Sequence, residues 1–152
     1  MTKIRKALAT DLDTIANFNL NLAMETENKI LDKNTVTQGV KFLLENEKYG
    51  TYYVATNSEQ IVGQAMYTYE WSDWRNGLFL WIQSVYVMPS HRKKGIFSTL
   101  YNEIKDICDN SSGICGIRLY AERENYTAHK TYENLGMTKC YYDMFEYEKK
   151  TT

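Results

Sequence analysis

Proline, histidine and paired cysteines are all scarce in this sequence. Its 152 residues include one proline, two histidines and three cysteines, Cys108, Cys115 and Cys140. The cysteines are odd in number and lack the paired spacing of zinc ligands. We therefore expect reduced thiols in a cytoplasmic protein, without a metal site.

An excess of one charge and long apolar runs are also missing. The chain carries 18 Lys and Arg against 19 Asp and Glu, a formal net charge of −1, whereas nucleic-acid-binding domains are strongly basic. It contains no run of about 18 apolar residues for a membrane span, and residues 1–14 lack the apolar segment of a signal peptide. The sequence thus predicts neither a nucleic-acid nor a membrane partner, and its length suits one domain, 1–152.

Apolar periodicity predicts the elements that are present. The nearly continuous apolar run 78–87 is typical of a central strand, which Pro89 ends. Further strands are predicted at 2–7, 51–56, 61–71, 116–122, 137–141 and 143–148, and helices at 12–22, 36–44, 96–108 and 125–136. The order β-α-α-β-β-β-α-β-α-β-β predicts an α/β fold, with one mixed sheet and helices on its faces.

A basic turn, "HRKKGIFS" (91–98), precedes the third predicted helix. The N-terminus of a helix exposes unpaired N–H groups and attracts phosphate. Arg92, Lys93 and Lys94 add positive charge, Gly95 lets a ligand approach the backbone, and Ser98 offers another donor. The turn alone is read equally well as a phosphate site or as a solvated basic surface.

Two segments resemble the GNAT superfamily of acetyl-CoA-dependent N-acetyltransferases. "RKKGIF" (92–97) is similar to its [RQ]-x-x-G-x-[GA] motif at Arg92 and Gly95, but has Phe97 at the final small position. "ENYTAHKTYENLGM" (124–137) is similar to N-x-x-A-x-x-x-Y-x-x-x-G-[FM]. The resemblance extends over nearly the whole chain in the order of its elements.

The resemblance implies a GNAT fold whose fourth and fifth strands splay apart to admit acetyl-CoA. Backbone amides of the turn would bind the pyrophosphate, and the fourth strand would pair with the pantetheine arm. Tyr132 would protonate the departing thiolate as general acid. The implied cofactor-binding residues are Val85, Tyr86, Val87, Arg92, Lys93, Lys94, Gly95, Ile96, Phe97, Ser98, Asn125 and Tyr132.

The general base is left open by the sequence. Many relatives place a glutamate on the fourth strand, where this chain has Gln83 and Ser84. Glu27 and Glu70 are candidate catalytic carboxylates, while a water chain or, less favourably, His129 are alternatives. The residues predicted to form an acidic, aromatic-walled acceptor site are Glu25, Glu27, Glu70, Trp71, Asp73, Trp74 and Gln83.

These features favour direct transfer of an acetyl group from acetyl-CoA to a small cationic amine through a ternary complex. A catalytically weak acetyl-CoA sensor is an alternative, because the fourth strand lacks a carboxylate. A protein N-acetyltransferase is a second alternative, disfavoured by the bulky segment 70–77. The tyrosine-rich end 139–149 fits either a homodimer contact or an ordinary sheet face.

Overall fold

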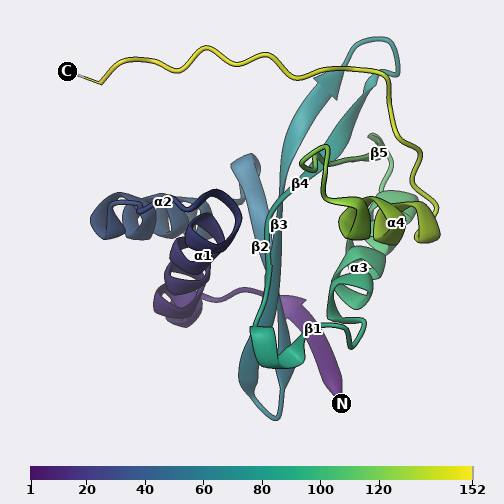
Figure 1. Cartoon of the computed structure of the whole chain (residues 1–152). Helices are drawn as coiled ribbons and strands as arrows, with labels where there is room; N and C mark the ends of the chain where they lie inside the picture. The colour runs from purple at the N-terminus through teal and green to yellow at the C-terminus, as the bar shows by residue number, and fades with distance from the viewer. Residues whose placement is uncertain (152) are drawn as a thin grey trace. The chain divides into compact units, whose positions relative to one another are not determined.

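The computed structural model describes residues 1–151 and divides into two compact units, Met1–Tyr120 and the residues from Ala121 onward. The first unit contains a sheet in the order β1-β2-β3-β4-β5 (Figure 1). Its strands are β1 (Thr2–Lys6), β2 (Gly50–Asn57), β3 (Gln60–Ser72), β4 (Gly77–Val87) and β5 (Ile114–Arg118). Its helices are α1 (Leu12–Glu27), α2 (Lys33–Glu45) and α3 (Ile96–Asn110), with short 3₁₀ turns η1 (Ala9–Asp11), η2 (Glu47–Tyr49) and η3 (Pro89–His91). The second unit contains α4 (Tyr126–Asn134).

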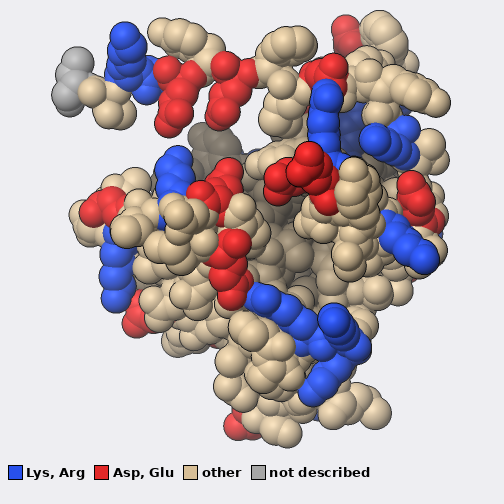
Figure 2. Space-filling view, viewed as in Figure 1, with Lys and Arg blue, Asp and Glu red and all other residues tan. Residues whose placement is uncertain are grey.

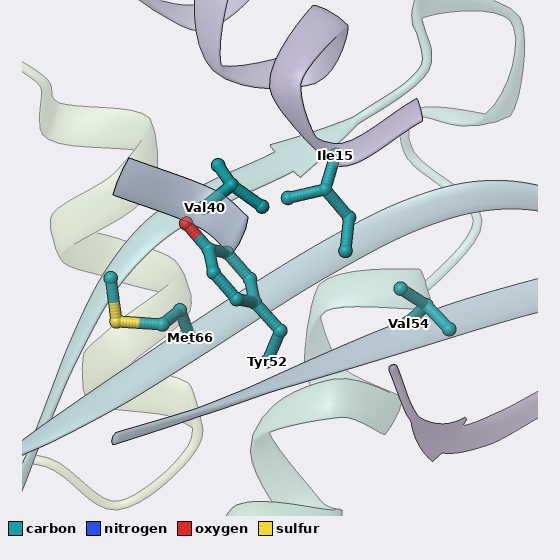
Figure 3. Close-up of a cluster of buried hydrophobic side chains, with 5 residues drawn as sticks. All are labelled: Ile15, Val40, Tyr52, Val54 and Met66. Atoms are coloured by element: carbon teal, nitrogen blue, oxygen red, sulfur yellow. The ribbon is translucent and has the colours of Figure 1, made fainter. Parts of the chain in front are cut away.

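Helices cover both faces of the five-stranded sheet. Figure 1 shows α1 and α2 on one face and α3 on the other. On the first face, α1 and α2 pack on the sheet through the buried side chains drawn in Figure 3, namely Ile15, Val40, Tyr52, Val54 and Met66. The helical spacing of apolar residues therefore builds the layers of a mixed α/β fold, as predicted.

A partly buried ion pair fixes the connection from β1 to α1. Asp11 is 7% exposed, and its carboxylate accepts hydrogen bonds from the Leu8 N–H at 2.7 Å and from Arg5 Nη1 at 2.7 Å. These interactions hold the pKa of Asp11 below its ordinary value, chiefly through the hydrogen bond from Arg5. The carboxylate thus ties the start of α1 back to the first strand.

The fourth and fifth strands separate after a short parallel pairing. Strands β1 to β4 pair antiparallel in sequence order, whereas β5 runs parallel to β4. This last pairing runs only from Leu78 opposite Ile114 to Trp81 opposite Arg118. The remainder of β4, from Ile82 to Val87, continues without β5 beside it. The predicted splaying of these strands is confirmed.

Two predictions about the end of the chain were wrong. The fifth strand spans Ile114–Arg118 instead of 116–122, and residues 137–151 form no helix or strand. Both segments have β-prone side chains, but a strand also needs a neighbour for its N–H and C=O groups. The pairing with β4 ends at Arg118, so the strand ends there too.

Candidate active site

The β4 strand carries a bulge at the point where it has left β5. Its register with β3 shifts between Gln64 opposite Tyr86 and Met66 opposite Gln83, which leaves two β4 residues facing one β3 residue. Ser84, within the bulge, has a φ of 53° in the left-handed region. Bulges bend a strand and redirect its backbone groups. The edge of β4 that faced β5 is therefore open from Ile82 onward. It combines an irregular backbone with residues, including Val85 and Val87, that have no β5 residue beside them.

A buried polar network supports this bulge from the side of α1. Gln64 is completely buried, and its Nε2 donates to Asn19 Oδ1 at 2.8 Å and to the Ser84 carbonyl at 3.1 Å. Asn19 Nδ2 in turn donates to the Tyr52 hydroxyl at 3.2 Å. Burial raises the pKa of Tyr52, so this hydroxyl stays protonated near neutral pH. The network joins α1, β2 and β3 to the bulged residue of β4.

The turn between β4 and α3 presents an open helix N-terminus. Gly95 is the N-cap of α3 with a φ of 76°, Lys93 has a φ of 62°, and no side chain among the described residues caps this end. Figure 2 shows Lys and Arg side chains gathered where Figure 1 places this turn, with acidic side chains beside them. The exposed Lys93 and Lys94 thus add positive charge to a helix end that already favours anions.

Gly63 lets the start of α3 lie close to the sheet. A Cβ atom at Gly63 would lie 3.1 Å from Ile96 Cγ2 and 3.2 Å from the Tyr86 carbonyl. Ile96 is buried, whereas the following Phe97 and Ser98 are half-buried, with the Phe97 ring 6.3 Å from that of Tyr101. The small residue therefore keeps the helix N-terminus next to the open part of β4.

Arg92 joins two residues that the sequence placed in different sites. Its Nη2 donates to Glu25 Oε2 at 2.8 Å, and its Nε donates to the Val87 carbonyl at 2.8 Å. The guanidinium also lies 5.4 Å from the centre of the Tyr86 ring. Arg92 thus connects the end of β4 to the last turns of α1, and it partly neutralises the Glu25 carboxylate.

The predicted acceptor residues fall into two groups. Glu70, half-buried on β3 opposite Phe79, forms an ion pair with Arg118. Phe79 lies eight residues from Val87 along β4, roughly 26 Å at 3.3 Å per residue. Glu25 and Glu27 therefore gather near one end of β4, and Glu70, Trp71, Asp73 and Trp74 near the other.

The polar side chain of Gln83 faces the β3 strand. Its Nε2 donates to Thr68 Oγ1 at 2.9 Å. Trp71 and Trp74, by contrast, are 59% and 87% exposed, so their indoles are surface groups of the β3–β4 hairpin. Gln83 lies between the two acidic groups along β4.

The second unit holds the candidate general acid on a short helix. Burial raises the pKa of Tyr132 on α4, so its phenol carries a proton throughout the neutral range. Asn125 caps this helix, because its Oδ1 accepts from the Ala128 N–H at 3.1 Å. The neighbouring His129 donates its Nε2–H to the Glu122 carbonyl at 2.8 Å, an interaction typical of a structural histidine.

Residues 1–151 offer neither a cluster of metal ligands nor a membrane-spanning helix. No group of three or more His, Cys, Asp or Glu side chains is placed to hold a metal ion in this range. None of the helices in this part of the chain combines the length and apolar character needed to cross a bilayer.

The polar network around Gln64 was missed by the sequence analysis. A signal was present, since Gln64 and Ser84 interrupt otherwise apolar strands. A polar side chain inside a buried strand needs a partner. Which partner it finds, here Asn19, depends on how α1 packs on the sheet, and periodicity does not specify this.

Known proteins share both the fold and the sequence family of this chain. The model of the acetyltransferase (GNAT) family matches residues 18–137. A crystal structure of a "possible acetyltransferase" from Clostridium difficile 630 is 57% identical, covers 99% of each chain and superposes with a TM-score of 0.91. A predicted acetyltransferase from Clostridium acetobutylicum, solved with acetyl-CoA, is 18% identical over 97% of this chain and 96% of its own, with a TM-score of 0.79.

A further structural neighbour has a named acceptor. Glucosamine-6-phosphate N-acetyltransferase from Arabidopsis thaliana is 21% identical over 97% of this chain and 98% of its own, with a TM-score of 0.73. No curated protein sequence matches the chain. The open strand edge beside a basic helix N-terminus and the match over residues 18–137 lead to one conclusion: the chain belongs to the GNAT acetyltransferase family.

Proposed function

We propose that this protein transfers an acetyl group from acetyl-CoA directly to the primary amine of a small, cationic acceptor. In this proposal residues 1–152 work as one N-acetyltransferase domain. The observation that carries the proposal is the open edge of β4, which leads to the uncapped N-terminus of α3. An extended amide chain ending in a diphosphate matches both features, because strand edges pair with amides and helix N-termini bind phosphate.

The cosubstrate would be held mainly by backbone groups. Val85, Tyr86 and Val87 would pair with the pantetheine arm, and N–H groups from Gly95 to Ser98 would bind the diphosphate. Lys93 and Lys94 would supply charge without fixed geometry. Arg92 already binds Glu25 and the Val87 carbonyl, so its part would be to hold the turn against β4.

The chemistry requires two proton transfers. A neutral amine attacks the thioester carbonyl carbon, so that a C–N bond forms and the C–S bond breaks. Tyr132 gives its proton to the departing thiolate, a role suited to a phenol whose pKa is raised. The amine loses its proton to water or to a carboxylate such as Glu27 or Glu70.

Direct transfer is also supported by the cysteines. Burial raises the pKa of Cys108, which makes its thiol a weak nucleophile. Cys115 lies beside Gly77 at the paired end of β4, away from the open edge. An acyl-cysteine intermediate therefore has no favourable residue in the first unit.

The acceptor class follows from the acidic side chains. Glu27 and Asp73 are exposed at opposite ends of β4, and the indoles of Trp71 and Trp74 accompany the second group. Carboxylates and indole faces both attract cationic amines. Polyamines, aminoglycosides and amino-acid derivatives are the classes to test.

The test is thiol release from acetyl-CoA against a panel of polyamines, aminoglycosides, amino acids and short peptides. We expect release that depends on one class of small amine, without a burst of acetylated enzyme when the acceptor is absent. Release only with peptides would favour a protein acetyltransferase. Silence across the panel, while acetyl-CoA still raises the melting temperature, would favour the sensor.

A charge reversal tests the placement of the diphosphate. Lys93→Glu with Lys94→Glu should raise the Kd for acetyl-CoA at least about tenfold, because two attractions become repulsions. The unfolding temperature of the free protein should change little, since both side chains are exposed. Lys3→Glu with Lys48→Glu, two exposed sites on β1 and η2, is the control. Equal affinity in the two variants would place the diphosphate elsewhere.

A further inference from the structure

The bulge of β4 carries a hydroxyl group in the part of the strand that β5 has left. Ser84 lies in the bulge with a φ of 53°, in the left-handed region, and its side chain is half-buried. Strand β5 pairs with β4 only as far as Trp81, so no β5 residue lies beside Ser84. A residue other than glycine in this conformation is held there by its surroundings, and such positions often serve a function.

The backbone of Ser84 fixes the orientation of the Gln64 amide. A carbonyl oxygen only accepts hydrogen bonds, so the Gln64 atom 3.1 Å from the Ser84 carbonyl is the donor Nε2. The other hydrogen of Nε2 goes to Asn19 Oδ1 at 2.8 Å. Gln64 Oε1 is then buried without a hydrogen-bond partner in residues 1–151. The amide keeps this orientation because both of its hydrogens have acceptors.

The orientation of Gln64 sets the direction of the next hydrogen bonds in the network. Because Asn19 turns its Oδ1 toward Gln64, it presents Nδ2 to the Tyr52 hydroxyl, which accepts at 3.2 Å. The Tyr52 ring itself packs in the apolar cluster drawn in Figure 3. The hydroxyl also forms a hydrogen bond with the side chain of Ser84. Since Tyr52 accepts from Asn19, its own proton is donated to Ser84.

The Ser84 hydroxyl is thereby left with a proton to donate. Its oxygen accepts from Tyr52, so its own O–H is available to a ligand. Hydrogen bonds that run in one direction along a chain polarise one another and strengthen the last donor. The buried network thus supplies an oriented donor at the open part of β4.

We propose that the Ser84 hydroxyl donates a hydrogen bond to the carbonyl oxygen of the acetyl group. Asn19, Tyr52 and Gln64 are positioning residues that orient this hydroxyl. The inference rests on the proposed binding of acetyl-CoA along β4. With the diphosphate at the turn beyond Val87, the thioester at the other end of the pantetheine arm lies on the side of Ser84. The two residues are three positions apart, roughly 10 Å at 3.3 Å each, a span that an extended amide arm covers.

The hydroxyl acts on the charge that forms during the transfer. When the lone pair of the amine forms the C–N bond, an electron pair of the C=O bond moves onto oxygen. The hydrogen bond from Ser84 to that oxygen then strengthens. The pair returns as the C–S bond breaks, and the electrons of the C–S bond leave with sulfur. The serine proton stays on Ser84 throughout, so this assistance needs no carboxylate on β4.

The first test is a double-mutant cycle at Ser84 and Tyr52. Ser84→Ala removes the donor and should lower kcat about 10²-fold, while the Kd for acetyl-CoA changes less than about threefold. Tyr52→Phe keeps the ring but removes the hydroxyl that orients Ser84, so kcat should fall to a smaller extent. The double variant should be no slower than Ser84→Ala, because the tyrosine acts only through the serine. Independent, multiplying losses would overturn the positioning role.

Two matched controls separate this role from a general loss of stability. Tyr53→Phe removes the hydroxyl of the next tyrosine of β2, which is 8% exposed against 5% for Tyr52 and stacks on Tyr67. Ser111→Ala removes the hydroxyl of a half-buried serine at the end of α3. Both variants should keep the native kcat. An equal loss in Tyr53→Phe and Tyr52→Phe would show that the phenols act through stability alone.

The second test needs no acceptor and uses infrared spectroscopy of bound acetyl-CoA that is isotopically labelled at its acetyl carbonyl. A hydrogen bond to the carbonyl oxygen lowers its stretching frequency, so the band should lie lower in the native protein than in Ser84→Ala. Thiol release with an unchanged band and an unchanged kcat in Ser84→Ala would overturn this inference and leave the proposed function intact. A band shifted by Ser84 without thiol release for any amine would do the reverse. A protein that does not bind acetyl-CoA would overturn both.

Discussion

At Tyr132 and Asp11 the local environment shifts the pKa in opposite directions. Burial raises the pKa of the Tyr132 phenol and so keeps its proton in place, as the proposed role of proton donor requires. An arginine and a backbone N–H keep the proton off the Asp11 carboxylate, where a charge is needed. The first effect is desolvation of the phenolate anion, and the second is hydrogen bonding to the carboxylate.

Replacement of Tyr132 by phenylalanine should slow the transfer step selectively. The change removes one hydroxyl and keeps the ring, so acetyl-CoA should bind with a Kd within about threefold of the original. Loss of a general acid lowers kcat by about 10²–10⁴-fold. Steady-state kinetics and calorimetric binding separate the two effects. A parallel loss of binding would assign Tyr132 to cosubstrate positioning instead.

Asp11 should make the fold sensitive to acid. Its pKa is lowered on folding, so its contribution to stability is complete above the ordinary value of 3.8 and is lost as the pH falls through the lowered value. Asp11→Asn should reduce the free energy of unfolding by about 1 kcal/mol at pH 7, a figure kept small because Arg5 is partly exposed.

The measurement is thermal unfolding between about pH 7 and pH 2. The two proteins should converge in stability at the acid end, because the native Asp11 is then protonated as well. Asp13→Asn, an exposed acid in the first turn of α1, is the control. A constant difference across the whole range would show that the ion pair carries no pH dependence.

At the scale of elements, β4 contains the change in strand pairing and the bulge, and it leads into the turn before α3. Its first residues pair on both sides, its later residues pair only with β3, and the bulge at Ser84 lies in the later part. The turn that leads into α3 begins where β4 ends. The strand therefore anchors the sheet at one end and offers backbone groups at the other.

Gln64 should stabilise the bulged form of β4. Gln64→Met preserves length and volume but removes the hydrogen bonds to Asn19 and to the Ser84 carbonyl, two half-buried residues. We expect a loss of about 1–3 kcal/mol in the free energy of unfolding. Acetyl-CoA affinity should fall as well, because Val85 to Val87 follow the bulge. Urea unfolding and binding calorimetry measure both.

The control for this variant is an exposed glutamine of the same strand. Gln60→Met lies at the start of β3 and should change neither the stability nor the affinity. If Gln64→Met were as stable as Gln60→Met, the buried amide would have no structural role. If only stability fell, the network would support the sheet without setting the backbone of β4.

Strand partners explain which elements the sequence predicted well. The run 78–87 and the helix after Gly95 were predicted nearly to the residue, because apolar periodicity and the glycine act locally. The bounds of β5 and the strands expected after Gly136 were wrong, since strand formation depends on a distant neighbour. The Arg92–Glu25 and Glu70–Arg118 ion pairs could not be predicted from apolar periodicity either, because each joins residues that are far apart in the sequence.

The whole molecule has almost no net charge, but Arg92, Lys93 and Lys94 form a local positive group at the β4–α3 turn. The net charge of −1 gives no long-range attraction for an anion, so recognition of a diphosphate would depend on the β4–α3 turn itself. The fold was predictable at this scale because two motifs in the right order identify the family. The acceptor was not, because its candidate residues are surface side chains on separate elements.

The short parallel pairing of β4 with β5 also has a consequence for the order of folding. Strands β2, β3 and β4 are joined by brief connections, whereas β5 is reached only through residues 88–113. Loop closure costs more entropy for longer loops, so the β2–β3–β4 meander should assemble first. Amides of Ile114–Arg118 should therefore exchange with deuterium through smaller openings than those of β3. Equal protection would mean that the sheet folds as one cooperative unit. Weaker protection of Ile114–Arg118 would make the side of β4 that faces β5 the last part of the sheet to form and the first to open.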